Sequence, residues 1–512
     1  AVGCGLLSSR VAARIGMTLR GEVFQKVVSF SHAEINRFST ASLITRSTND
    51  IQQVQMVIVM LLRMVIYAPI LGIGGVLKVM ATRTGMGWII GVAVGCVVLL
   101  VAVLMGVAMP KFKKMQELVD RVNLVAREIL TGLPVIRAFS RERHEEQRFD
   151  VANRSLMRTQ LFTNRVMSVM QPAMMLVMNA ITVLIVWVGA QKMDMGGMQV
   201  GDMMAFITYT MQIVMSFLML SVMSVMLPRA GVAAGRINAV LETPCTIHDP
   251  ETSRDAELAH PRGVVRFEDV CFRYPDSDAD VLTHITFTAN PGETTAIIGS
   301  TGSGKSTILN LIPRFFDVTS GRVTIDGVDI RELSQHRLRE LLGYVPQKGI
   351  LFSGDIASNL RFGGEDITDE QIEKAAAIAQ AADFIEQKPE KYHDPIAQGG
   401  SNVSGGQKQR LSIARAIAKD PAIYLFDDSF SALDYKTDTA LRRALNENIQ
   451  SATVIIVAQR ISTILHAQQI IVLDDGEIAG IGTHDELMRT CATYQEIAKS
   501  QLSESELGGM QE

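Results

Sequence analysis

The sequence has few cysteines, little net charge and no signal-peptide pattern, and each of these shortages excludes a class of protein. The cysteines are scattered without a C-x-x-C pair or a histidine partner; they are Cys4, Cys96, Cys245, Cys271 and Cys491. This pattern excludes a disulfide framework and a zinc site, and it is typical of inert thiols in a reducing compartment. The formal net charge of −4 argues against a nucleic-acid partner. No stretch has the pattern of a cleavable signal peptide.

Apolar residues are abundant instead, and they gather in one half of the chain. Hydrophobic residues make up 47% of the 512 residues, and nearly all of the 27 methionines precede Leu241 together with the long apolar runs. The half after about Pro261 has the composition of a soluble α/β domain. We therefore predict an all-α polytopic membrane domain over residues 1–240, a linker over 241–262, a soluble domain over 263–500 and a tail over 501–512.

Four runs of the first half are long and apolar enough to cross a bilayer, which takes about 20 helical residues. They cover residues 54–80, 88–109, 170–190 and 202–227. Residues 1–37 are predicted to form one helix that starts as the tail of another span, so we expect an N-terminal piece to be missing. Lysines and arginines are dense after Pro110 but sparse in the turns at 81–85 and 191–201. The positive-inside rule then places those turns outside and the basic helices in the cytoplasm.

A glycine-rich stretch in the second half, from Gly299 to Thr307, fits the phosphate-loop pattern G-x4-G-K-[ST]. It lies between a predicted strand, 294–298, and a predicted helix, 306–311, as such a loop requires. Glycines let backbone N–H groups approach a phosphate closely. Lys305 supplies a charge for the β- and γ-phosphates, and the Ser306 hydroxyl can ligate Mg²⁺. The stretch predicts a site for ATP and Mg²⁺; the alternative is a structural glycine turn.

Further polar residues fall at the ends of other predicted strands. Asp427 suits the hold on Mg²⁺, and Asp428 is placed as a general base, although its side chain is one methylene shorter than that of Glu. Gln347 and Gln459 each end a strand. Tyr274 ends another and can stack on an adenine, or be an ordinary strand-end aromatic. Together, in this order, these residues predict a phosphoryl-transfer site.

The peptide VSGGQKQR, from Val403 to Arg410, is the most specific motif of the chain. With this signature, the chain resembles the ATP-binding cassette (ABC) transporters over essentially its whole length. The resemblance implies a type-1 exporter-like membrane domain of six spans, the first of them missing here, followed by an α/β P-loop NTPase domain with a helical subdomain over 263–500. It also implies coupling helices at 39–47 and 133–141 that touch the ATPase domains.

The same resemblance assigns the site residues by the family's motifs. These are Gly299, Ser300, Thr301, Gly302, Ser303, Gly304, Lys305, Ser306 and Thr307 in the Walker A loop; Tyr274 at the adenine; Ser306, Gln347 and Asp427 at Mg²⁺; Ser404, Gly405, Gly406 and Gln407 in the signature; and Ser431, Ala432, Leu433 and Asp434 in the D-loop. In this family two ATPase domains enclose two ATP molecules, each between the Walker A loop of one chain and the signature of the other. One chain therefore cannot complete a site.

Two residues depart from the family pattern. The family's catalytic Glu is here Asp428, and its switch His is here Gln459, which cannot take up or give a proton as His can. Both lie on the Walker side, whereas the signature is intact. This pairing resembles the subunit of heterodimeric exporters that contributes the Walker half of a degenerate, slowly hydrolysing site. The alternative is a homodimer in which Asp428 and Gln459 work well enough.

We therefore expect ATP-driven export of amphipathic small molecules, lipids or peptides by a half-transporter of the bacterial inner membrane, with its ATP-binding domain in the cytoplasm. The expected partners are a second, different half-transporter, the lipid bilayer and the cargo. The methionine-rich faces of the last spans fit an amphipathic cargo. Two alternatives remain: a regulatory nucleotide-binding subunit with negligible turnover, and an importer built on the exporter scaffold.

Overall fold

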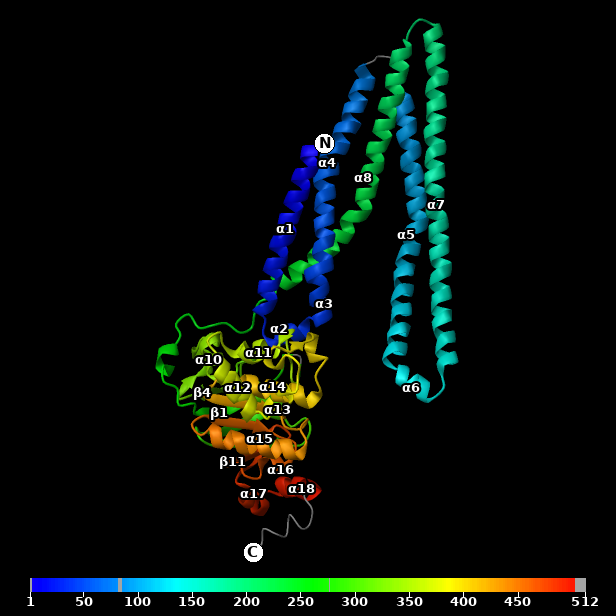
Figure 1. The fold of residues 1–512 in the computed structure, drawn as a ribbon. Coiled ribbons are helices and arrows are strands. Elements are labelled where there is room, and N and C mark those ends of the chain that lie inside the picture. The colour runs from blue at the N-terminus through cyan, green and yellow to red at the C-terminus, as the bar shows by residue number, and fades with distance from the viewer. Residues whose placement is uncertain (1, 82–84, 276, 502–512) are drawn as a thin grey trace. The chain divides into compact units, whose positions relative to one another are not determined.

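The computed structural model describes residues 2–81, 85–275 and 277–501, which form two compact units (Figure 1). The first, called here the helical unit, comprises residues 1–28 and 40–243. The second, the α/β unit, comprises residues 29–39 and 244–512. The chain therefore contributes a short early segment to the α/β unit before its main part begins.

The helical unit consists mainly of long helices. Its elements are α1 (Val2–Val28), α3 (Thr40–Thr45), the π-helical turn η1 (Arg46–Asp50), α4 (Ile51–Ala81), α5 (Gly87–Thr131), α6 (Leu133–Ala138), α7 (Glu142–Asp194) and α8 (Val200–Leu241). α4 packs along α8, and α5 packs along α7 (Figure 1). α5 continues through Pro110. The apolar span and the basic stretch after it therefore form one helix.

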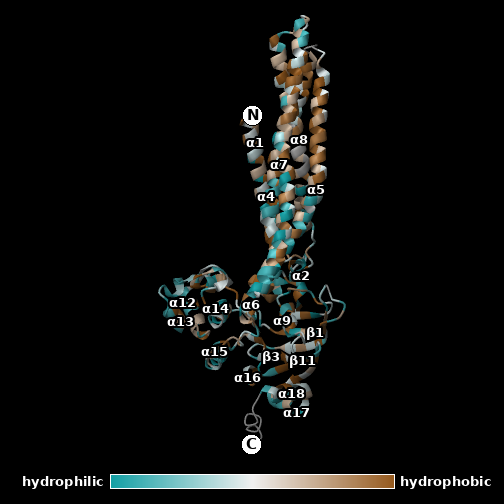
Figure 2. Ribbon diagram, turned by 90° about the vertical axis from the view of Figure 1, so that its right-hand side faces the viewer, coloured by the Kyte–Doolittle hydropathy of each residue, from teal (hydrophilic) through white to brown (hydrophobic). Residues whose placement is uncertain are grey.

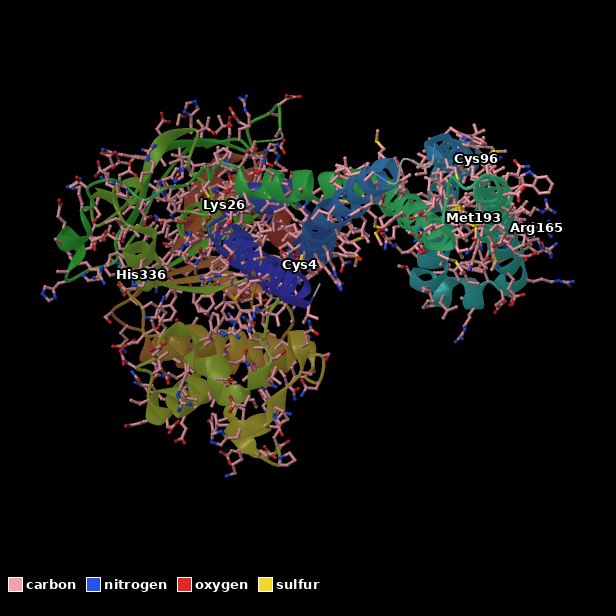
Figure 3. All side chains as sticks on the ribbon, turned by 90° about the horizontal axis from the view of Figure 1, so that it is seen from above. Cys4, Lys26, Cys96, Arg165, Met193 and His336 are labelled. Atoms are coloured by element: carbon pink, nitrogen blue, oxygen red, sulfur yellow. The ribbon has the colours of Figure 1, made fainter. Side chains whose placement is uncertain are left out.

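Four helices of the described residues are long and apolar enough to cross a membrane. They lie in Thr40–Ala81, Gly87–Thr131, Glu142–Asp194 and Val200–Leu220, which confirms the four predicted spans. Apolar residues gather toward one end of the unit and hydrophilic residues toward the other (Figure 2). Between the helices, Ile89 and Phe206 are buried, and Met193, which Figure 3 labels, packs against their cluster. Leu176 and Trp187 are exposed on α7, as is typical of side chains that face lipid.

The single helix predicted over residues 1–37 is wrong. α1 ends at Val28, and a separate helix, α2 (His32–Arg37), begins after Ser31. The Ser31 hydroxyl accepts a hydrogen bond from the Ala33 N–H, and the Glu34 carboxylate accepts one from the Ser31 N–H (2.6 Å). The S-x-x-E pattern that marks this helix start is visible in the sequence.

The first expected coupling segment also differs from the structure. α3 lies inside the expected range 39–47, but it belongs to the helical unit and continues through η1 into α4. The segment that packs on the α/β unit is the earlier one, 29–39, which contains α2. α6 lies within the second expected segment, 133–141, as a short helix of the helical unit.

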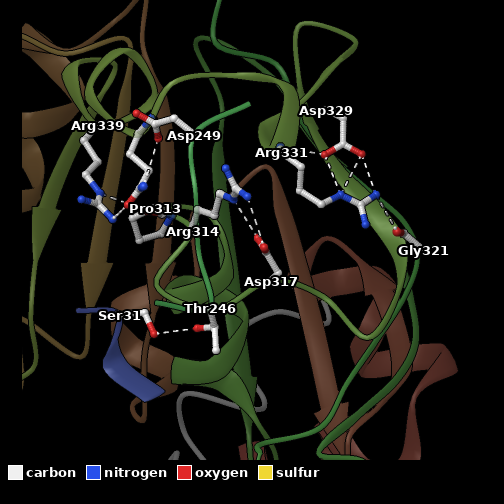
Figure 4. A network of polar contacts seen from close by, with 11 residues as sticks. Ser31, Thr246, Asp249, Pro313, Arg314, Asp317, Gly321, Asp329, Arg331 and Arg339 are labelled. Carbon is white, nitrogen blue, oxygen red and sulfur yellow. Dashed lines mark hydrogen bonds and ion pairs between the residues drawn. The ribbon is translucent and has the colours of Figure 1, made fainter. Parts of the chain in front are cut away.

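Aromatic and polar contacts fix α2 within the α/β unit. The imidazole of His32 stacks on the ring of Phe315, with centroids 4.4 Å apart. The Thr246 N–H donates to the Glu34 carboxylate (3.1 Å), and the hydroxyls of Ser31 and Thr246 lie 3.1 Å apart (Figure 4). The guanidinium of Arg339 lies 5.9 Å from the Phe315 ring.

The α/β unit contains three sheets. A six-stranded sheet has the order β12-β11-β3-β10-β9-β6, a four-stranded sheet has the order β2-β1-β4-β5, and β7 pairs with β8. The strands are β1 (Val265–Phe272), β2 (Leu282–Ala289), β3 (Thr294–Gly299), β4 (Ser320–Ile325), β5 (Val328–Asp329), β6 (Leu342–Val345), β7 (Gly354–Asp355), β8 (Pro395–Ile396), β9 (Ile423–Asp427), β10 (Thr453–Val457), β11 (Gln469–Asp474) and β12 (Glu477–Gly482).

Besides α2, the described residues of this unit form ten α-helices. They are α9 (Lys305–Leu311), α10 (Gln335–Glu340), α11 (Ile356–Leu360), α12 (Asp369–Ile378), α13 (Ala382–Glu386), α14 (Gly405–Ala418), α15 (Tyr435–Asn448), α16 (Ile461–Ile464), α17 (His484–Thr490) and α18 (Ala492–Gln501). Short 3₁₀ turns are η2 (Asp255–Leu258), η3 (Ile330–Glu332), η4 (Arg361–Gly363), η5 (Lys391–His393) and η6 (Gln398–Gly400). Two buried apolar clusters hold the unit together; residues of β1, β2 and α9 share one, and residues of α12, α14 and α18 share the other.

The strand directions explain where a site can form. β3, β6, β9, β10 and β11 run parallel, so their carboxyl ends share one edge of the sheet. Gly299 and Asp427 end β3 and β9, and Gln347 and Gln459 follow β6 and β10. The side chains that the sequence placed at strand ends therefore meet at this edge, where α/β sheets bind ligands.

Residues 244–262 of the predicted linker pack on the α/β unit. The Asp255 carboxylate accepts hydrogen bonds from the Ser334 N–H (2.9 Å) and hydroxyl (2.7 Å). Leu258 is buried in the apolar cluster beside β1. The Gln335 N–H donates to Asp249 (3.0 Å). The chain thus becomes part of the α/β unit soon after α8 ends.

The contact between His32 and Phe315 predicts a pH dependence. Burial lowers the pKa of His32 from its usual 6.5, and the positive charge of Arg339 lowers it further. The neutral ring is the form that packs, so its stabilising effect is complete above pH 6.5 and is lost as the pH falls below that value. Between about pH 7.5 and about pH 5.5, we expect amide hydrogen exchange of residues 29–39, corrected for its intrinsic rate, to accelerate roughly threefold to tenfold.

The control is His32→Phe, which keeps an aromatic ring on Phe315 but cannot be protonated. In this variant of the full chain the acceleration should disappear. If it persists, another group controls the docking of α2.

Candidate nucleotide-binding site

A cavity of about 370 Å³ opens at the carboxyl edge of the six-stranded sheet. Its lining residues come from the phosphate loop and from the ends of several strands: Tyr274, Val281, Thr301, Gly302, Gly304, Lys305, Ser306, Thr307, Gln347, Asp427, Asp428, Val457 and Gln459. A larger hollow of about 850 Å³ is lined largely by α15 and residues 462–468 and contains none of the predicted site residues. The smaller cavity is therefore the candidate site.

Two glycines of the loop are required by its close packing. A Cβ on Gly299 would lie 2.1 Å from the carbonyl oxygen of Leu473. Gly304 has a φ of +94°, and a Cβ there would lie 2.6 Å from Leu282. Gly304 directly precedes α9, whose first backbone N–H groups have no partner within the helix. The loop can therefore offer backbone donors to an anion.

The ammonium of Lys305 is buried on the inner side of this loop. It donates hydrogen bonds to the carbonyl oxygens of Ser300 (2.6 Å) and Gly299 (3.0 Å) and to the Ser303 hydroxyl (3.4 Å). Burial lowers the pKa of Lys305, while the carboxylates of Asp428 and Asp427 oppose this effect. Phosphate oxygens are acceptors of the same kind that also carry charge, so the position fits a nucleotide phosphate.

Asp427 and Ser306 form the part of the site that fits a divalent cation. The Ser306 hydroxyl donates to Oδ1 of Asp427 (2.8 Å). Burial raises the pKa of Asp427; the Ser306 hydrogen bond and Lys305 lower it, and the neighbouring Asp428 raises it. Two adjacent buried carboxylates beside a hydroxyl offer the oxygen ligands that Mg²⁺ prefers. Ser306, Asp427 and Gln347 are the residues that would hold it.

Asp428 receives side-chain amides from two neighbouring loops. Its backbone has a φ of +46°, which is uncommon outside glycine. Its Oδ2 accepts hydrogen bonds from the Gln459 amide (2.9 Å) and the Gln347 amide (3.4 Å). Its N–H donates to the carbonyl oxygen of Val457 (2.9 Å). The predicted catalytic residues Asp428 and Gln459 are thus in direct contact.

Tyr274 stands at the wall of the cavity. Its hydroxyl lies 3.0 Å from the Thr307 hydroxyl. Its ring meets Phe272 and Phe316 edge to face, with centroids 4.8 and 5.2 Å away. The ring is therefore held beside the phosphate loop, where an adenine could stack on it.

The signature lies outside this cavity. Ser404 caps α14, because its hydroxyl accepts from the Gln407 N–H (3.3 Å) and its own N–H donates to the Gln407 side chain (3.0 Å). Gly405 and Gly406 form the first turn of α14. None of these four residues lines the cavity, so the described part of this chain keeps its signature apart from its own phosphate loop.

The predicted D-loop is attached to Asp428 at one end and to α15 at the other. The Ser431 hydroxyl donates to the backbone carbonyl of Asp428 (2.8 Å). Asp434 caps α15 by accepting from the Thr437 N–H (3.0 Å) and hydroxyl (2.7 Å), and these bonds lower the pKa of Asp434. Leu433 is buried, whereas Ala432 is exposed. The loop therefore joins buried Asp428 to an exposed segment of the chain.

Gln409 of α14, to which no sequence pattern points, contacts the backbone beside the site. Its amide nitrogen donates to the carbonyl oxygen of Pro346 (3.3 Å), and its amide oxygen accepts from the Gly349 N–H (3.1 Å). It therefore grips the backbone on both sides of Gln347. Gln409 is part of the signature peptide, but nothing in that peptide indicates where its amide lies.

Two family models match the chain. One, described as "ABC transporter transmembrane region", matches residues 3–217. The other, described as "ABC transporter", matches residues 282–431. The chain is 41% identical to an ABC transporter ATP-binding protein of Mycobacterium tuberculosis (strain ATCC 25618 / H37Rv), covering 100% of this chain and 88% of the relative.

Two further proteins extend this similarity. An ABC transporter ATP-binding protein of Bacillus subtilis is 38% identical over 97% of this chain and 86% of its own length. The solved structure of a bacterial Atm1-family ABC exporter with ATP bound superposes with a TM-score of 0.80 at 27% identity, covering 98% of this chain and 87% of the other. The similarity thus includes both units.

The position of Lys305 predicts how ATP binding responds to its loss. Lys305→Ala should weaken binding of MgATP to this chain roughly tenfold to a hundredfold, because a buried charge-assisted contact is lost. Equilibrium binding of a fluorescent ATP analogue measures the change. Lys374→Ala, which removes an exposed lysine of α12, is the matched control and should bind normally. Equal binding by both variants would refute the site.

Proposed function

Because this chain belongs to the ABC transporter family, as an exporter-type half-transporter, we propose that it works with a second, different half-transporter and supplies the weaker of two ATP sites. It is a multi-pass membrane protein whose ATP-binding domain hydrolyses ATP in support of transport. The features that bear on its weaker role are the substitutions at Asp428 and Gln459.

The residues of the cavity divide the work of holding the nucleotide. The loop N–H groups and Lys305 bind the phosphates, and Tyr274 supports the adenine. Ser306, Gln347 and Asp427 would hold Mg²⁺, which would neutralise charge on the phosphate oxygens. These residues orient the nucleotide toward Asp428. Nothing in this set departs from what binding requires.

The observation that carries the proposal is the contact between Asp428 and Gln459. Asp428 has a shorter side chain than Glu, so its carboxylate reaches less far, and the amides of Gln459 and Gln347 orient its Oδ2 without lengthening that reach. It is thus poorly placed to accept a proton from an attacking water. Gln459 cannot take that proton in its stead, because an amide does not titrate at physiological pH. Binding should therefore be strong and hydrolysis slow.

The signature, which does not line this cavity, supports a different role. Ser404 and Gln407 form a complete cap at the start of α14, outside this chain's own cavity. Such a helix start offers backbone N–H donors to the phosphate of a nucleotide bound by another chain. We infer that it completes the partner's competent site.

The composition of the helical unit supports a proposal for the cargo and the location. We propose that the cargo is an amphipathic small molecule, lipid or peptide, because methionines line α7 and α8 and a flexible thioether adapts to varied apolar shapes. The unit would lie in the bacterial inner membrane with the α/β unit in the cytoplasm.

A second candidate function is a regulatory nucleotide-binding subunit with negligible turnover. The short reach of Asp428 and the absence of a titrating group at Gln459 favour it. The two candidates differ only in whether this chain's own site turns over at all.

Restoring the family residues should accelerate hydrolysis. In Asp428→Glu with Gln459→His, the longer carboxylate reaches further and the imidazole can exchange a proton, so we expect ATPase activity of the purified complex to rise by about tenfold or more. Adding Lys305→Ala to this variant should remove the gain, which would locate it in this chain's own cavity. An unchanged rate would show that hydrolysis is limited elsewhere.

The composition of the native complex tests the partnership. We expect the complex purified through a tag on the full-length chain to contain one copy of this chain and one copy of a different half-transporter, as measured by native mass spectrometry. Two copies of this chain would overturn the heterodimer, and Asp428 and Gln459 would then have to support whatever hydrolysis occurs.

A further inference from the structure

The last residue of α18 reaches the loop that carries Gln459. The side-chain amide of Gln501 donates through Nε2 to the backbone carbonyl of Gln459 (2.9 Å). Its Oε1 accepts from the backbone N–H of Ile461 (2.9 Å). One side chain thus bridges the backbone on both sides of Arg460, although Gln501 and Gln459 are 42 positions apart in the sequence.

Both bonded groups lie where the loop turns into α16. Ile461 is the first residue of this four-residue helix, so its N–H has no acceptor within the helix. Arg460 has an extended backbone, with φ −108° and ψ 130°. Gln501 therefore supplies the acceptor that the Ile461 N–H lacks within the helix. It also fixes the backbone carbonyl of Gln459.

α18 is anchored firmly enough to act as a support. Tyr494 and Ala498 are fully buried against the core beneath the six-stranded sheet. The Tyr494 hydroxyl lies 2.7 Å from Nδ1 of His484, which is itself buried. Residues 494, 498 and 501 follow a helical spacing of four and three, so they share one face of α18. The face that anchors the helix is thus the face that carries Gln501.

The loop of Gln347 is held in the same manner. Gln409 bonds to Pro346 and Gly349, on either side of Gln347. Gln347 and Gln459 both donate to Asp428 Oδ2. The backbone next to each of them is hydrogen-bonded by a glutamine distant in the sequence, Gln409 and Gln501 respectively. Arg442 donates to the carbonyl oxygen of Ser462 (2.7 Å), so α16 has a second side-chain support just after the turn that Gln501 contacts.

We propose that Gln501 is a positioning residue for ATP hydrolysis: it holds the Gln459 backbone so that the Gln459 amide stays on Asp428. This inference rests on the proposed function, because it takes Asp428 as the group that acts on the attacking water. Gln501 lines no part of the cavity, so it affects turnover and not nucleotide binding.

The test compares Gln501→Met, which keeps the length of the side chain and removes both hydrogen bonds, with Lys499→Met on the exposed side of α18. Full-length complex is incubated with labelled 8-azido-ATP and cross-linked. The conversion of the label on this polypeptide to ADP is then followed. We expect Gln501→Met to slow ADP formation about threefold to tenfold while half-maximal labelling stays within about twofold. Lys499→Met should match the unaltered chain.

Two further variants separate positioning from folding. Gln501→Glu keeps the acceptor for the Ile461 N–H but loses the donor to Gln459, so it should slow ADP formation less than Gln501→Met; it decides the question if the Met variant fails to fold. In a Gln459→Ala background, Gln501→Met should cause no additional slowing of ADP formation, because Gln501 acts through the Gln459 side-chain amide. An additional slowing of the same size would overturn the proposal.

The outcomes also separate this inference from the proposed function. Labelling that is absent, or unaffected by Lys305→Ala, would refute the nucleotide site itself. Normal labelling with equal ADP formation in Gln501→Met and Lys499→Met would overturn only the positioning role of Gln501. Faster ADP formation in Gln501→Met would overturn that role as well. The absence of ADP formation on the unaltered chain would do the same, since Gln501 would then support no hydrolysis.

Discussion

Two neighbouring carboxylates, Asp427 and Asp428, are buried at the end of β9, and the surrounding loops compensate for the cost of holding charge there. Ser306 follows β3, Gln347 follows β6 and Gln459 follows β10, and each donates a hydrogen bond to one of these carboxylates. The sheet order β3-β10-β9-β6 places these strands within two positions of β9. The topology of the sheet therefore decides which loops can reach the carboxylates, and the phosphate loop is among them.

The chemical character of these donors shapes what the site can do. An amide donates a hydrogen bond at any physiological pH, whereas an imidazole in the same place would gain and lose a proton. The two amides on Asp428 Oδ2 therefore keep their donor character across that pH range. Such donors suit the proposed role of a site that binds ATP and hydrolyses it slowly.

The sequence predicted the parts of the site that depend on local order. The residues at strand ends were found because parallel strands bring their carboxyl ends to one edge, and the loop glycines because their conformation leaves little choice. Gln409 and Gln501 were not found, because each acts on backbone that is distant in the chain and no local pattern marks a side chain for such a contact. The break after Val28 was missed although Ser31 and Glu34 signal it, because the basic residues on either side continue a helical pattern.

Solvation supplies a separate argument for a partner, because each unit leaves apolar groups exposed outside the spans. On α6, Val135 is 60% exposed, and Phe139, which follows the helix, is 75% exposed. In the α/β unit, Phe352 and Phe362 stack with centroids 4.5 Å apart and are 47% and 61% exposed. The guanidinium of Arg415 lies within 5.5 Å of both ring centres, so this pair is held rigidly. Fixed, exposed aromatic surface is typical of protein interfaces, and a second half-transporter supplies protein surface of the kind that could cover it. The exposed aromatic groups are thus an observation, separate from the ATP site, that agrees with the proposed second half-transporter.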